Sequence, residues 1–182
     1  MKAIRFSPIV EKILLREGWH PGRHVAIKNV EDWFKSGNIL HPAAEAVLHE
    51  FDGLYIRRSH EDPDGVEIAT ACLYFNLFAG KSGIKKIKES HKILNINLVP
   101  VADMESLGCF LCVDELGRVF ELFDDLIYYA PNFDEALERA VTGRFHAPLP
   151  PELQPGSWPM ISEVPGHPSW IGSGRQPPRS VL

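Results

Sequence analysis

Residues 109–123 have the sequence Cys-Phe-Leu-Cys-Val-Asp-Glu-Leu-Gly-Arg-Val-Phe-Glu-Leu-Phe, in which two apolar segments flank a polar turn. The turn, Asp114-Glu115-Leu116-Gly117, ends in glycine, and glycine adopts the positive φ angles that tight hairpin connections require. The pattern predicts two antiparallel strands, at 109–113 and 118–123. An antiparallel sheet is therefore expected at the centre of the fold.

More strands are expected on the N-terminal side of this hairpin. Apolar and aromatic residues fill 66–78, and the turn Asp62-Pro63-Asp64-Gly65 separates them from a shorter segment at 54–57. Residues 98–101 form another short apolar segment. Together with the hairpin, these segments are expected to form mostly antiparallel strands.

Helix signals occur before, between and after the strands. Polar or proline-containing starts are present at Ser7-Pro8, Asn29, His41-Pro42 and Asn132. A further helix is expected around 84–94, where apolar residues recur at helical spacing. In the helix that begins at Asn29, we expect Trp33 and Phe34 to face inward. The chain is thus predicted to be an α+β domain, a mostly antiparallel sheet with flanking helices.

Proline divides the chain near residue 146. Nine of the 15 prolines follow this point, and proline at that density prevents a regular helix or a central strand. We expect a domain at 1–145 and an extended or loosely docked Pro-rich tail at 146–182. Trp158 and Trp170 could anchor that tail to its own domain or to another chain.

Composition limits the classes of function. A net charge of −5 argues against general nucleic-acid binding, which requires clustered Lys and Arg. The N-terminus lacks a signal-peptide pattern, and no apolar stretch is long enough to cross a membrane. Three cysteines are too few for a disulfide framework. A cytoplasmic protein without membrane contact is expected.

No linear motif supports a catalytic, cofactor or metal site. Gly80-Lys81-Ser82 lacks the earlier glycine of a phosphate-binding loop, since that position is Phe75. Cys109 and Cys112 have the spacing of a metal or redox pair. In a strand, however, they would point to opposite faces and line the core. An enzyme would need a pocket that brings a histidine and carboxylates together from distant segments.

Acidic residues gather around two turns. The candidate partner-binding residues are Glu61, Asp62, Asp64, Glu67, Glu121, Asp124 and Asp125. Such residues commonly serve only solubility. Alternatively, they attract a basic protein partner and speed its encounter.

The sequence Leu14-Leu15-Arg16-Glu17-Gly18-Trp19-His20-Pro21-Gly22-Arg23 resembles the opening of the third subfamily of SUKH superfamily immunity proteins. Phe51-Asp52-Gly53-Leu54, the hairpin at 114–120 and the helix at 136–143 are similar to later landmarks of that subfamily, in the same order. The sequence departs from the family pattern at Asp52 and Ala102, where glycine is usual. The family-motif positions are Gly18, Trp19, Pro21, Arg23, Gly53, Gly117 and Arg118, and we expect them to be structural.

The resemblance implies a single SUKH-like domain that binds and neutralises a cognate toxin domain of a bacterial polymorphic or contact-dependent system. Such a toxin would be a nuclease or a nucleic-acid deaminase. The immunity protein would use no cofactor and would not be an enzyme. The alternative is a non-catalytic adaptor, scaffold or regulator of the wider superfamily, with the tail as its recognition segment.

Overall fold

The computed structural model describes residues 5–61, 67–77, 80–104, 109–122 and 126–142. The sheet contains six antiparallel strands in the sequential order β1-β2-β3-β4-β5-β6. Their bounds are β1 Tyr55–Glu61, β2 Glu67–Phe75, β3 Val99–Met104, β4 Cys109–Val113, β5 Val119–Leu122 and β6 Leu126–Ala130. The α+β prediction with an antiparallel sheet is confirmed, whereas β6 was not predicted.

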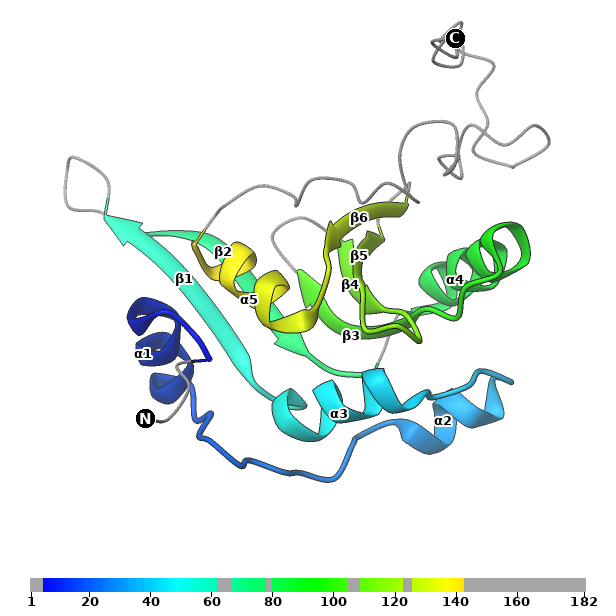
Figure 1. Ribbon diagram of the computed structural model, residues 1–182, viewed down its shortest axis with the longest axis horizontal. Helices are drawn as coiled ribbons and strands as arrows, with labels where there is room; N and C mark the ends of the chain where they lie inside the picture. Colours follow the sequence, from blue (N-terminus) through cyan, green and yellow to red (C-terminus); the bar gives the residue numbers. More distant parts are fainter. Residues whose placement is uncertain (1–4, 62–66, 78–79, 105–108, 123–125, 143–182) are drawn as a thin grey trace, which may run out of the picture.

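The helices of the described residues are α1 Pro8–Arg16, α2 Val30–Lys35, α3 Pro42–Phe51, α4 Gly80–Leu94 and α5 Phe133–Thr142. Helix α4 lies in the connection between β2 and β3, which are nevertheless neighbours in the sheet. In Figure 1, α1 lies at one end of the molecule, and α2 and α4 lie at the other. The residues of the predicted tail, with Trp158 and Trp170, lie outside the described residues.

The core joins helices α3 and α5 to the sheet. The rings of Phe51 in α3, Phe75 in β2 and Phe133 in α5 contact one another, with centroids 5.1–6.0 Å apart. Phe51 and Phe75 are fully buried. Burial of these rings stabilises the packing of two helices, distant in sequence, on one face of the sheet.

Pro100, the second residue of β3, is accommodated by a β-bulge. Pro100 pairs with Cys112 and Ala102 pairs with Leu111, so the register shifts across Val101. Because proline has no N–H to donate, it interrupts a regular ladder and is tolerated at such a bulge. The extra residue, Val101, accepts a hydrogen bond from the Asn76 N–H at 3.2 Å.

Two of the predicted helix caps differ from expectation. Asn29 occupies the N-cap of α2 but has a left-handed backbone (φ 62°) and makes no side-chain cap bond. Ser7 occupies the N-cap of α1, yet its hydroxyl donates to Glu138 of α5 at 2.8 Å. The prediction that Phe34 faces inward is wrong, because this side chain is 54% exposed while Trp33 is buried.

Candidate partner-binding site

The turn after α1 places Trp19 in the core. Gly18 has φ +91°, its N–H donates to the Leu15 carbonyl, and the Trp19 N–H donates to the Leu14 carbonyl at 2.9 Å. This is the Schellman arrangement, in which a left-handed glycine ends the helix. The buried Trp19 ring then contacts Phe6 edge-on.

Glu50 links this turn to the N-terminal segment and to α5. Its Oε1 accepts from Trp19 Nε1 at 2.9 Å and from Arg5 at 2.6 Å. Arg5 also donates two hydrogen bonds to Asp134, at 2.8 and 2.7 Å. Because these carboxylates favour the charged guanidinium, they raise the pKa of Arg5 despite its partial burial.

Arg23 is held over the C-terminal end of α3. The preceding turn contains Pro21 and Gly22 (φ +79°) and is closed by the Arg23 N–H, which donates to the His20 carbonyl at 3.0 Å. The Arg23 guanidinium donates to the carbonyls of Glu50 and Asp52, the latter at 2.9 Å. Its positive charge therefore lies at the negative end of the α3 dipole.

Asp52 and Gly53 form the corner between α3 and β1. Asp52 (φ −51°, ψ 133°) and Gly53 (φ +80°) are the central residues of a turn closed by the Leu54 N–H, which donates to the Phe51 carbonyl. These angles match a type II turn, which requires the positive φ at Gly53 only. Aspartate is therefore conformationally acceptable at 52, where the family pattern has glycine.

The carboxylate of Asp52 is buried. Its Oδ2 accepts from the Lys28 N–H at 2.8 Å, whereas Oδ1 has no hydrogen-bond partner among the described residues. Burial raises the pKa of Asp52, although the Lys28 hydrogen bond and charge and the Arg23 charge act in the opposite direction. Among the described residues, the hydrogen bond and the nearby charges therefore offset only part of the cost of burying this carboxylate.

Asp114 organises the β4–β5 hairpin turn. Its Oδ1 accepts from the Leu116 and Arg118 N–H groups, and its Oδ2 accepts from Arg118 Nε at 2.6 Å. Gly117 (φ +80°) donates its N–H to the Asp114 carbonyl. The predicted hairpin is confirmed, and the buried Asp114 side chain satisfies the backbone of its own turn.

Both cysteines of the Cys-x-x-Cys segment are fully buried, as predicted. Cys109 and Cys112 are three residues apart in β4, along which side chains alternate, so the two thiols occupy opposite faces of the sheet. Burial raises the pKa of both thiols, which makes them weak nucleophiles. In the described ranges no group of three or more His, Cys, Asp or Glu side chains is arranged to hold a metal ion.

The structure describes few of the predicted acidic contact residues. Asp62, Asp64, Asp124 and Asp125 lie outside the described residues, as do the side chains of Glu61 and Glu67. Glu121 is half-buried in β5, between Leu111 and Ile127 on the neighbouring strands. Burial raises the pKa of Tyr129 to about 12, and the negative charge of Glu121 acts in the same direction. Glu121 thus lies within the sheet near Tyr129 and not on a protruding turn.

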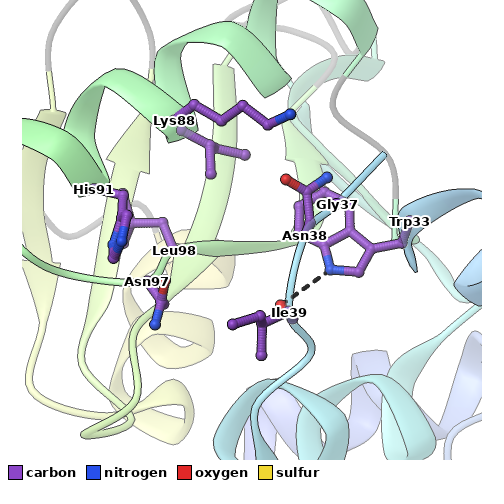
Figure 2. A pocket seen from close by; sticks show the side chains of 9 residues that line it. Trp33, Gly37, Asn38, Ile39, Lys88, His91, Asn97 and Leu98 are labelled. Carbon is purple, nitrogen blue, oxygen red and sulfur yellow. Dashed lines mark hydrogen bonds between the residues drawn. The ribbon is translucent and has the colours of Figure 1, made fainter. Parts of the chain in front are cut away.

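A cavity of about 160 Å³ lies between the α2–α3 connection and the C-terminal half of α4. Figure 2 shows Trp33 and Asn38 on one side and Lys88 and His91 on the other. Trp33 Nε1 donates to the Ile39 carbonyl at 3.1 Å, which fixes the connection against the indole. Sequence reasoning did not predict this site, because its walls come from segments about 50 residues apart with no shared motif.

None of the helices in the described part of the chain is both long and apolar enough to cross a bilayer. Comparison with curated proteins and with solved structures gave no significant match. The family model for the SUKH-3 immunity protein matches residues 6–143, which span every described helix and strand. The chain therefore belongs to the SUKH-3 immunity protein family.

Proposed function

We propose that this chain binds a cognate toxin domain of a polymorphic or contact-dependent system and neutralises it in the cytoplasm by protein–protein contact. The observation that carries the proposal is the SUKH-3 family match across residues 6–143. The proposed toxin is a basic nuclease or nucleic-acid deaminase domain. A net charge of −5 supports a basic partner, because opposite net charges speed encounter.

The contacts of the family-motif residues support a structural role for them. Trp19 and Arg23 bond to α3, and Gly53, Gly117 and Arg118 form turns. Such positions determine the shape of the domain and leave its outer surface free to differ between relatives. We propose accordingly that neutralisation requires no catalysis by this chain.

The acidic segments at 61–67 and 121–125 are proposed to steer the encounter with the toxin. Steering by exposed charge weakens as salt shortens the Debye length, to about 8 Å at physiological ionic strength. We therefore expect the association rate constant to fall steeply with added salt, and to fall further in a variant with Asp62, Asp64, Asp124 and Asp125 changed to Asn. An association rate that is independent of salt would contradict steering without contradicting neutralisation.

The test of the function is co-expression with the toxin domain encoded beside the gene for this chain. We expect rescue of growth together with co-purification of a stable complex. An active toxin that neither forms a complex nor loses its toxicity would overturn the proposal. That result would favour the adaptor or scaffold function.

A further inference from the structure

The cavity between the α2–α3 connection and α4 is not used by the hairpin or by the Trp19–Arg23 corner. We propose that it receives one apolar side chain of the toxin domain, from a loop that also presents a carboxylate. The inference rests on the proposed function and adds to it a place of contact and a partner chemistry. Four features of the described residues support it.

The first feature is the size and lining of the cavity. The cavity has a volume of about 160 Å³ and opens to the surface, and its apolar walls include Trp33, Ile87 and Leu98. An engineered protein cavity of about 150 Å³ holds one benzene molecule. One aromatic or branched aliphatic side chain therefore fits this cavity, in the manner of an interface anchor.

The second feature is a donor without a partner. Asn38 Nδ2 is buried and makes no hydrogen bond among the described residues, although Asn38 lines the cavity. Because a buried amide without an acceptor is unfavourable, native proteins rarely retain one without a reason. This nitrogen is shielded from solvent, so an oxygen of the toxin loop would satisfy it once rotation of the Asn38 amide turns the nitrogen toward the cavity.

The third feature is the positive charge of α4. The helix contains five lysines and one glutamate, in a chain whose net charge is negative. Lys88 and His91 line the cavity, and both are exposed. Lys88 Nζ donates to the Ser36 carbonyl at 2.9 Å and forms no ion pair within the described residues. Its charge is therefore available to a carboxylate on the inserted loop, which a toxin domain of net positive charge can still carry.

The fourth feature is exposed apolar surface beside the cavity. Ile39 lines it and is 63% exposed, and Phe34, on the helix that contributes Trp33, is 54% exposed. Large apolar side chains next to a cavity are typical of the centre of a protein interface.

The experiment measures the affinity of the full chain for the catalytically inactivated toxin domain encoded beside its gene, by calorimetry. Ile39→Asp is expected to weaken binding by about 100-fold, since replacement of an apolar side chain at the centre of an interface has effects of this order. Lys88→Glu is expected to weaken binding by about 10-fold. Matched controls lie on α1, at the other end of the molecule in Figure 1. Ile9→Asp changes a side chain that is 61% exposed, and Lys12→Glu reverses another exposed lysine.

Asn38→Ala separates a binding role from a structural one. Removal of a donor without a partner should leave the melting temperature unchanged or raise it, while the affinity for the toxin falls by about 10-fold. A purely structural asparagine would lower the melting temperature and leave affinity unchanged. This result would contradict the assignment of Asn38.

The possible outcomes distinguish this inference from the proposed function. If the wild-type chain does not bind the correctly folded toxin domain, the proposed function itself is contradicted. Wild-type chain that binds, with cavity variants that bind equally well, overturns only the cavity inference. Wild-type dimerisation that Ile39→Asp abolishes, with toxin binding retained, would assign the cavity to a second copy of this chain.

Discussion

His41 Nε2 lies 3.1 Å from the carbonyl oxygen of Val113, a residue 72 positions later in the chain. The other ring nitrogen, Nδ1, accepts from the Ala44 N–H at 3.2 Å, so the proton of the ring is on Nε2. One buried imidazole therefore caps α3 and also holds the end of β4. It connects the helical layer to the hairpin.

Replacement of His41 should destabilise the domain by an amount that depends on which of its two hydrogen bonds is lost. His41→Ala leaves the Ala44 donor and the Val113 acceptor without partners, and is expected to lower the free energy of unfolding by about 2–3 kcal/mol. His41→Asn retains an N-cap oxygen but is too short to reach Val113, and should cost about 1 kcal/mol. Urea denaturation measures both. The exposed His20→Ala is the control, and an equal loss there would contradict the role of His41.

The stabilising effect of Arg23 should depend on its guanidinium group, which donates to two carbonyls at once. Arg23→Ala removes the bonds to the Glu50 and Asp52 carbonyls at the end of α3 and should cost about 2 kcal/mol of unfolding free energy. Arg23→Lys keeps the charge at the helix C-terminus but cannot make both bonds, so an intermediate loss is expected. If urea denaturation gives the lysine variant full wild-type stability, charge alone accounts for the effect of Arg23.

The buried carboxylate of Asp52 should give the domain an unusual dependence of stability on pH. Its pKa is raised on folding, so the ionised carboxylate destabilises the native state at neutral pH. Below the unfolded-state pKa the group is protonated in both states, and this cost is absent. Asp52→Asn should therefore stabilise the domain at about pH 7 and have a smaller effect at about pH 3, since unfolded aspartate titrates near 3.9.

Thermal unfolding of wild type and Asp52→Asn at both pH values measures the difference. Asparagine keeps an oxygen that can accept from the Lys28 N–H, so the comparison isolates the charge. A gain that is larger at low pH would show that Lys28 and Arg23 stabilise the carboxylate more than burial destabilises it.

Gly117 should tolerate asparagine better than alanine. Its φ of +80° is unfavourable for any residue with a Cβ, although the space around an added Cβ is open. Gly117→Ala is expected to cost about 1 kcal/mol, while Gly117→Asn should cost less, because asparagine enters the left-handed region more readily. Guanidinium denaturation checks the order. An alanine variant as stable as wild type would show that the turn has changed type.

Local patterns predicted much of the fold. The hairpin at 109–123 was predicted from the turn Asp114-Glu115-Leu116-Gly117 between two apolar segments, and in the structure Asp114 accepts hydrogen bonds from the backbone of that turn. Gly18 follows α1 and Gly37 follows α2, and each has the positive φ with which glycine ends a helix. Strand β6 was missed because Leu126–Ala130 has no turn signal before it like that of the hairpin.

The predicted functional residues were those that gather in sequence. Acidic clusters are visible in a linear chain, so they became the candidate contact surface. The cavity was not visible, because Asn38 and Ile39 meet Lys88 and His91 only after folding. Phe34 was predicted to be buried because helical spacing alone does not indicate which face meets the sheet.

The sequence by itself determined the family, the α+β class and the local geometry of turns and caps, since each depends on residues within a few positions of one another. Tertiary structure decided what long-range contacts alone can specify. It gave His41 its partner in β4, placed Arg23 on α3 and left the Nδ2 atom of Asn38 buried without an acceptor among the described residues. Hydrogen bonding and burial depend on the whole fold, because a side chain acquires its environment from every element that packs around it.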